Sequence, residues 1–497
     1  MCTIKNVLVR HKFKSVLLIL LWITGIIYSV RFITKGSDKK EKGVKLLQSR
    51  YSPTVFKDLF RIAEIKEYCN PPDQISLGSE GQVRDGYSLE LVAVLVRHGD
   101  RGPLLKIKNQ SLINCGVKEP LKYPLFGQFT DVMNSKLKWY RASAEFHSFP
   151  PYPYSKQCWS GHLTQLGALQ ELRLGRLLGN LYNKHWNLLS QTWNVQNVLV
   201  FSTMYARTFQ SALAFMFGFL PSLSPDKKLT IHAVEDTSFC GKHNLCRCPG
   251  LKYMQGQLNK KMRNLLISHQ AVVELIHKIS SFVKPSQKTP NITQGGTLFD
   301  SLMGYLCHGA KLPCETNDNF PCITRNKLKK LVSYLDWEGK QLATYPIYQK
   351  KSRLRMYGFM VMLQRLFHDK INKKLPERFI LFSGHDITLA ALSTTLGYAN
   401  GIFPPYVSRI IFELYKSNNT SLTSVSNYFI RILFNGKDIT KYAPFCKNVT
   451  KITKGQLNGN LFSLLCPVEN FFDFVSNSYF HNFGVSSFSE ACRPSPP

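Results

Sequence analysis

Five apolar runs rich in β-branched side chains predict the core strands of a sheet. Each run is short enough for a strand, and the segments between most of them are long enough to hold helices. Strands that alternate with helical segments indicate an α/β fold. The predicted strands are residues 89–96, 197–202, 378–383, 408–415 and 428–434.

Three other segments repeat apolar residues at helical spacing. Residues 163–182 read LTQLGALQELRLGRLLGNLY and predict an amphipathic helix, and residues 207–219 and 352–367 predict two more. The block from about 236 to 344 holds six of the cysteines and no strong strand. We therefore predict that this block is an inserted, mainly helical cap.

The N-terminus contains an uncharged apolar run at residues 16–30, flanked by basic residues. With its neighbours it predicts a signal-anchor that spans the membrane over residues 16–33, short enough to suit the thinner early secretory membranes. A cleaved signal peptide is the alternative, but bulky residues stand where its small-residue cleavage site would be. We predict a cytosolic tail at 1–15, a stem and lead-in at 34–88 and a lumenal domain at 89–497.

Cysteines and glycosylation sequons place the large domain in an oxidising lumen. Twelve of the 13 cysteines follow the apolar run, and an even number there predicts disulfides. Residues 246, 248, 307, 308, 314 and 322 could instead be zinc ligands, but their spacing matches no common zinc pattern. The predicted glycosylation acceptors are Asn109, Asn291, Asn418, Asn419 and Asn448.

The chain is strongly basic, with 64 Lys and Arg against 31 Asp and Glu and a net charge of +33. Such a charge favours acidic partners such as polyanionic glycans or lipid headgroups, although a generally soluble basic surface has the same composition. No zinc finger, aromatic RNA-binding pattern or basic zipper is present, so nucleic acid is not an expected partner.

Polar side chains follow three of the predicted strands. Arg97 and His98 end the first, Ser202 and Thr203 the second, and residues 384–386 (Gly-His-Asp) the third. Ligands of open α/β sheets bind outside the carboxyl ends of the strands. The sequence therefore predicts a ligand-binding site at the edge of the sheet where these strands end.

The first of these ends reads RHGDRGP and suggests chemistry on phosphorus. Gly99 permits a sharp turn, and the guanidinium groups of Arg97 and Arg101 suit a tetrahedral dianion. Positive neighbours keep His98 neutral, which is the nucleophilic form of imidazole. As a core histidine it would require two adjacent arginines to be buried without an anion, which is costly.

RHGDRGP resembles the R-H-G-x-R-x-P signature of the histidine acid phosphatases. Further motifs match in family order: the helix LTQLGALQELRLGRLL, the element STMYARTFQS, the element SGHDITLAAL and the turn NGKDIT. The resemblance covers about residues 89–492. It implies the histidine-phosphatase fold, with a mixed central sheet flanked by helices and an inserted cap.

The resemblance also implies roles for the residues in these motifs. His98 would be the nucleophile that becomes phosphohistidine, and Asp386 the proton donor. Outside its motif, Arg207 would be taken for a surface salt-bridge partner, and Asp386 for the N-cap of the following helix, a role we expect in addition. No cofactor and no metal are implied. The residues expected to bind phosphate are Arg97, Arg101, Arg207 and His385.

The domain layout narrows the expected substrate. A single N-terminal anchor before a lumenal domain is typical of Golgi glycan-processing enzymes, and within the family it resembles members that remove 2-O-phosphate from xylose in the proteoglycan linkage region. We therefore expect a type II Golgi membrane phosphatase that acts on a phosphorylated proteoglycan glycan, with glycan-synthesising enzymes as possible partners. The alternatives are a broad-specificity lumenal acid phosphatase, an inositol phosphate phosphatase, and a non-catalytic protein that binds acidic glycans.

Overall fold

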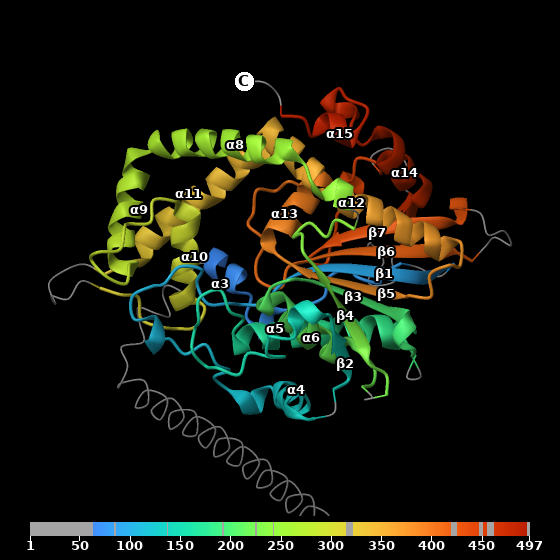
Figure 1. Ribbon diagram of the computed structural model, residues 1–497, viewed down its shortest axis with the longest axis horizontal. Coiled ribbons are helices and arrows are strands. Elements are labelled where there is room, and N and C mark those ends of the chain that lie inside the picture. Colours follow the sequence, from blue (N-terminus) through green and yellow to red (C-terminus); the bar gives the residue numbers. More distant parts are fainter. Residues whose placement is uncertain are drawn as a thin grey trace, which may run out of the picture. The chain divides into compact units, whose positions relative to one another are not determined.

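A computed structural model of the protein (Figure 1) describes most of the chain after its first 62 residues. The chain separates into the units Met1–Asp58 and Leu59–Pro497, and all described residues belong to the second. The predicted anchor, Asn419 and Asn448 lie outside the described residues. The described ranges are 63–83, 86–136, 138–190, 193–223, 226–241, 243–314, 322–418, 425–446, 451–454 and 462–494.

The described strands form one mixed, ten-stranded sheet in the order β2-β4-β3-β5-β1-β6-β7-β10-β9, with β8 paired to β7. The ladders from β2 to β1 are parallel, and those from β1 to β9 are antiparallel. All five predicted strands are present. The strands are β1 Tyr87–Arg97, β2 Tyr140–Ala142, β3 Val198–Thr203, β4 Leu229–Val234, β5 Phe379–Gly384, β6 Arg409–Ser417, β7 Tyr428–Phe434, β8 Lys437–Asp438, β9 Lys451–Lys454 and β10 Phe462–Pro467.

The three predicted helices are also present, with longer or shifted ends. The first becomes α5 followed by a π-helical turn, and the third extends by a turn or more at each end. The α-helices are α3 Ala63–Cys69, α4 Pro124–Asn134, α5 Gln165–Gly179, α6 Ala206–Phe219, α7 His243–Cys246, α8 Pro249–Ile267, α9 Gln270–Val283, α10 Gly295–Leu306, α11 Arg325–Thr344, α12 Pro346–Ile371, α13 Asp386–Thr395, α14 Val468–Asp473 and α15 Phe488–Ala491.

Helices cover both faces of the sheet, with α5 and α6 on one face and α12 and α13 on the other (Figure 1). The central strand β1 shows why both faces of the sheet must be covered. Val92, Val94 and Val96 pack into the core on the α5–α6 side, whereas Ala93 and Leu95 pack into the core on the α12–α13 side. Alternation of side chains along a strand therefore gives β1 two buried apolar faces, as its unbroken apolar run requires.

The segment between β4 and α12 is helical, and Figure 1 shows α8 to α11 gathered beside the sheet rather than over it. α10 is joined to the rest of the fold near the end of β1. The ring of Pro103 lies where a side chain on Gly304 would stand, and the Tyr305 hydroxyl donates to the carbonyl of Lys108. The helical segment thus contacts the loop after β1, where the polar residues gather.

All twelve cysteines after the apolar run are disulfide-bonded, as predicted, so the zinc alternative is wrong. The pairs are Cys69–Cys307, Cys115–Cys158, Cys240–Cys246, Cys248–Cys492, Cys314–Cys322 and Cys446–Cys466. This many disulfides is typical of a protein of the secretory pathway. Within the described part of the chain, no helix has both the length and the apolar character needed to cross a membrane.

Residues 63–83, part of the predicted stem and lead-in, pack into the core on the α5–α6 side of the sheet and contact β6. Glu80 forms a buried ion pair with Arg409, and the Gly81 amide donates to Glu413, which pairs with Arg431. These carboxylates and guanidinium groups are almost fully buried. Because each buried charge has an opposite partner, the pairs fix the lead-in chain on the sheet.

Candidate active site

The parallel ladder β3-β5-β1 brings the predicted site residues to one edge. Arg97 is in register with Gly384, and Ser202 with Ser383, so the three strands end side by side. β6 runs antiparallel to β1, and therefore the loop before β6 reaches the same edge. Four stretches that lie far apart in the sequence thus converge on the end of β1.

Arg97 is fully buried and its contacts hold it in one position. It donates to the carbonyl of Pro404 (2.6 Å) and the hydroxyl of Tyr68 (3.1 Å), and its Nη2 lies 2.9 Å from Oδ2 of Asp386. Its guanidinium also lies over the ring of Tyr406 at 4.3 Å. Arg97 is therefore a rigid buried cation with Asp386 as its carboxylate partner.

The hydrogen bond of His98 determines which ring nitrogen is free. Nδ1 lies 2.8 Å from the carbonyl oxygen of Gly99, and a carbonyl oxygen only accepts, so Nδ1 carries the proton. Nε2 then keeps its lone pair. Burial first, and then the charges of Arg207 and Arg97, hold the pKa of His98 well below the usual 6.5. His98 is therefore a neutral imidazole with Nε2 available as a nucleophile.

This lowered pKa predicts activity in acid. Because only the neutral imidazole can attack, activity falls as the pH drops through the folded-state pKa of His98, which is below 6.5. We expect kcat/KM, corrected for the ester's own titration near about pH 6, to stay level as the pH falls through 6.5. A pH–rate profile with an aryl phosphate measures this, and a corrected acid limb centred at the ordinary histidine pKa would contradict it.

Arg101 is held by a residue from the helical segment. Its Nη2 and Nη1 donate to the two carboxylate oxygens of Asp300 on α10, at 2.7 and 3.3 Å. Asp300 also accepts a hydrogen bond from the Leu104 amide at 2.9 Å. One carboxylate thus orients both the guanidinium and the loop that carries it, which makes Asp300 a positioning residue.

Removing this carboxylate tests its role. In Asp300→Ala, Arg101 loses a two-point partner, and we expect KM for an aryl phosphate to rise about tenfold with kcat changed less than about threefold. Asp300→Glu should restore part of the loss, and Asp473→Ala, an exposed acidic position on α14, is the control. An unchanged or lower KM in Asp300→Ala would show that Asp300 does not orient Arg101 for an anion.

Arg207, at the start of α6, differs from Arg97 and Arg101 in its contacts. Its Nη1 donates weakly to the carbonyl of Gly161 (3.4 Å), its guanidinium lies over the Tyr205 ring at 4.4 Å, and its buried Nε has no hydrogen-bond partner. Among the residues that the structure describes, no carboxylate pairs with it. Burial, followed by the charge of Arg101, lowers the pKa of Arg207 to about 10. The Asp386 charge opposes this lowering only in part, and such an incompletely compensated cation favours a bound anion.

His385 and Asp386 begin α13. His385 is the N-cap residue, and its Nε2 lies 2.9 Å from the hydroxyl of Thr203. Burial and then Arg207 lower the pKa of His385 to about 3. Asp386 is the first helical residue, so the expectation that it serves as the N-cap is wrong. Its Oδ1 nevertheless accepts the Ile387 amide at 2.7 Å, which leaves a carboxylate at the positive end of the helix.

Two further residues, Asp100 and Ser211, position the loop after β1. Asp100 accepts from the hydroxyl of Thr164, the N-cap of α5, at 2.6 Å and lies 2.9 Å from Nε2 of His308. Ser211 on α6 accepts from the Gly99 amide at 3.2 Å. Both contacts fix the chain directly after His98.

Sequence reasoning missed several residues near the arginines. Tyr68, Phe403 and Tyr406 all lie within 5.2 Å of the Arg97 guanidinium, measured to the ring centroids. They come from α3 and the loop before β6, which carry no motif. One feature of the sequence could have pointed to Asp300, because it is the only charged residue within α10.

The described sequons differ in accessibility. Asn109 and Asn418 are exposed, whereas Asn291 is half-buried and its Nδ2 lies 2.6 Å from Nε2 of His277. A glycan at Asn291 would attach at the atom that His277 contacts. Glycosylation at these positions stays a prediction.

Comparison with known proteins identifies the family to which the chain belongs. The family model of the histidine phosphatase superfamily (branch 2) matches residues 88–290 and 325–435, more than half of the chain. The chain therefore belongs to this superfamily, as a hydrolase of the histidine acid phosphatase family.

Two relatives that are similar to this chain over most of its length are phosphatases. The chain is 30% identical to 2-phosphoxylose phosphatase 1 of Danio rerio over 87% of each protein, and 24% identical to prostatic acid phosphatase of Bos taurus over 66% of this chain and 80% of that protein. Among solved structures, the phytase of D. castellii matches with a TM-score of 0.46 and 15% identity, covering 87% of this chain and 88% of the phytase.

Proposed function

We propose that this chain is a phosphomonoesterase that works through a phosphohistidine on His98. Nε2 attacks phosphorus, a P–N bond forms, and the P–O bond to the alcohol breaks while the protonated Asp386 carboxyl gives its proton to the leaving oxygen. Water then attacks phosphorus and yields a proton to the Asp386 carboxylate. The P–N bond breaks, inorganic phosphate leaves, and His98 is neutral again.

The observation that carries this proposal is the cationic surplus around a neutral imidazole. Arg207 forms no ion pair with a described carboxylate, and its guanidinium is close enough to Arg101 that the Arg101 charge lowers its pKa more than the Asp386 charge raises it. A phosphoryl group at His98 Nε2 would supply the missing negative charge. Preorganised guanidinium donors stabilise the transferring oxygens without reorganisation, and such electrostatic stabilisation usually contributes more to catalysis than any other single effect.

We further propose that the substrate is xylose 2-O-phosphate in the glycosaminoglycan–protein linkage region. The name of the Danio rerio relative, which covers 87% of this chain at 30% identity, supports this substrate. The predicted type II anchor and the disulfides support a Golgi lumenal location. The net charge of +33 suits a growing chain rich in carboxylate and sulfate.

Competing substrates test the proposal. The full-length chain is assayed on the 2-O-phosphorylated linkage tetrasaccharide, p-nitrophenyl phosphate and inositol hexakisphosphate at matched concentrations. We expect kcat/KM for the tetrasaccharide to exceed the other two by at least about tenfold, since contacts to the sugar add transition-state binding. Fast aryl phosphate hydrolysis with no tetrasaccharide turnover would indicate a broad acid phosphatase, and preference for the inositol ester a phytase-like enzyme. Binding without any turnover would indicate a glycan-binding protein.

A further inference from the structure

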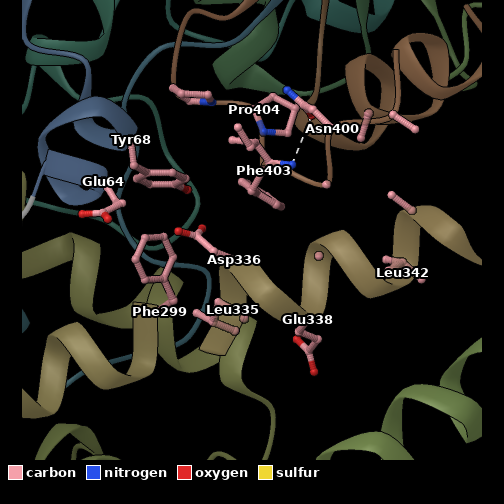
Figure 2. A pocket seen from close by; sticks show the side chains of 18 of the residues that line it. Glu64, Tyr68, Phe299, Leu335, Asp336, Glu338, Leu342, Asn400, Phe403 and Pro404 are labelled. Atoms are coloured by element: carbon pink, nitrogen blue, oxygen red, sulfur yellow. Dashed lines mark hydrogen bonds between the residues drawn. The ribbon is translucent and has the colours of Figure 1, made fainter. Parts of the chain in front are cut away.

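A separate cavity of about 370 Å³ adjoins the Arg97 side of the site (Figure 2). It lies between α3, α8, α10, α11, α12, α13 and the loop at 399–405. His98, Arg207 and Asp386 do not line it. Its volume is within the range of small-molecule sites, about 300–1,000 Å³, and most of its lining is apolar.

The charged residues of this lining are all acidic. No Lys, Arg or His occurs among the lining residues, although the chain has twice as many basic as acidic side chains. This composition is opposite to that of the phosphate site and unsuited to an anion. The lining carboxylates are Glu64, Glu67, Asp300, Asp336 and Glu338.

Aromatic rings from three elements line the same cavity. The Tyr68 centroid lies 5.0 Å from that of Phe299 and 5.9 Å from that of Phe403. Tyr68 and Phe403 already contact one cation, because the Arg97 guanidinium lies 5.2 Å from each centroid. Figure 2 shows the Asp336 carboxylate directed toward Tyr68 and Phe299. Aromatic faces beside a carboxylate are the surroundings that an ammonium group prefers.

Asp300 is paired with Arg101, whereas Asp336 lacks full compensation. Burial and then the charge of Glu64 raise the pKa of Asp336, while Lys340 acts in the opposite direction. Glu338 differs, since its Oε1 accepts from the Tyr334 hydroxyl at 3.1 Å and Figure 2 shows its carboxylate pointing away from Asp336. A bound cation beside Asp336 would relieve its repulsion with Glu64.

We propose that this cavity is a second binding site, for an alkylammonium group on an apolar stem held between Asp336 and the rings of Tyr68, Phe299 and Phe403. The stem would pack on apolar residues such as Leu335 and Leu342, which line the cavity. A free aliphatic amine and a lysine side chain of a polypeptide share this chemistry. The site stands on its own contacts and is independent of the xylose phosphate proposal.

Calorimetric titration of the full-length chain with n-hexylamine and with 1-hexanol, its uncharged counterpart, tests the site. We expect hexylamine to bind at least about tenfold more tightly, because only the ammonium group interacts with the carboxylate and the ring faces. Asp336→Asn should remove most of this preference, and the matched control Glu338→Gln should keep it within about threefold. Equal affinity for the two probes, or a preference that survives Asp336→Asn, overturns the proposal.

A second variant and a peptide pair complete the test. Phe403→Leu replaces an exposed ring, so we expect the variant to fold normally. Its hexylamine binding should be about threefold weaker, because one ring face is lost. Unchanged hexylamine binding in Phe403→Leu counts against the ring contact. The peptide acetyl-Gly-Gly-Lys-Gly-Gly-amide and its norleucine analogue distinguish the two sources of the ammonium group. Tighter binding of the lysine peptide would identify the ligand as a lysine side chain of a polypeptide. Equal binding of the two peptides would identify the ligand as a free aliphatic amine. Hydrolysis of p-nitrophenyl phosphate, measured in parallel, shows whether a failure belongs to this site or to the phosphatase.

Discussion

His98→Ala is expected to abolish phosphate release and to leave no acid-labile phosphate on the protein. Among the described residues at this edge, His98 has the ring nitrogen that is free to form a P–N bond, because its Nδ1 is committed to the Gly99 carbonyl and the His385 ring bonds to Thr203. Removing a nucleophile costs several orders of magnitude, and we expect a fall in kcat of at least about 10⁴-fold.

The measurement is rapid quench of the full-length chain with a ³²P-labelled ester, followed by mapping of the labelled histidine. His147→Ala, an exposed histidine in a 3₁₀ turn, is the matched control and should keep both turnover and label. Label on another residue, or turnover within about tenfold of the unaltered chain in His98→Ala, would contradict the phosphohistidine mechanism.

Asp386→Asn should reveal its role through the leaving group. An amide cannot donate the proton that an alkoxide needs, so we expect kcat for an alkyl or sugar phosphate to fall by about 10²–10⁴-fold. p-Nitrophenolate leaves without protonation, and its formation should slow much less. The substituted carboxamide keeps one acceptor oxygen for the two donors that the carboxylate now binds, Arg97 at 2.9 Å and the Ile387 amide at 2.7 Å. Phosphate binding should persist nevertheless, because Arg101 and Arg207 contact other groups.

Burst kinetics with both esters, together with the inhibition constant of inorganic phosphate, provides the measurement. Asp369→Asn is a suitable control, because this acidic residue of α12 pairs with Arg365 and His368 on its own helix. Equal losses for both leaving groups would indicate that Asp386 acts through Arg97 rather than as the acid. Loss of phosphate binding would assign it a structural role.

Local patterns predicted the centre of the fold well. The runs that became β1, β3, β5, β6 and β7 are apolar along most of their length, which is what a strand buried on both faces requires. The peripheral strands were missed for a physical reason. β2 is three residues long, too short for any periodicity, and β4 is only partly buried.

The sequence by itself also determined which candidate site residues lie together. Arg97, His98, Arg207, His385 and Asp386 directly follow or end parallel strands, or begin the helices after them, so local order was enough to place them together. It determined the disulfide-bonded character of the domain as well, from the number of cysteines, although not their pairing.

Only the tertiary structure decided what surrounds those groups. Arg97 and Pro404 are 307 residues apart in the sequence, and Arg101 and Asp300 are 199 apart. No local sequence pattern can therefore predict either contact. The same holds for the acidic cavity, whose Tyr68, Asp336 and Phe403 come from elements without a motif. Such contacts depend on how helices pack against a sheet edge, and packing responds to the shape and volume of many side chains at once rather than to any local pattern.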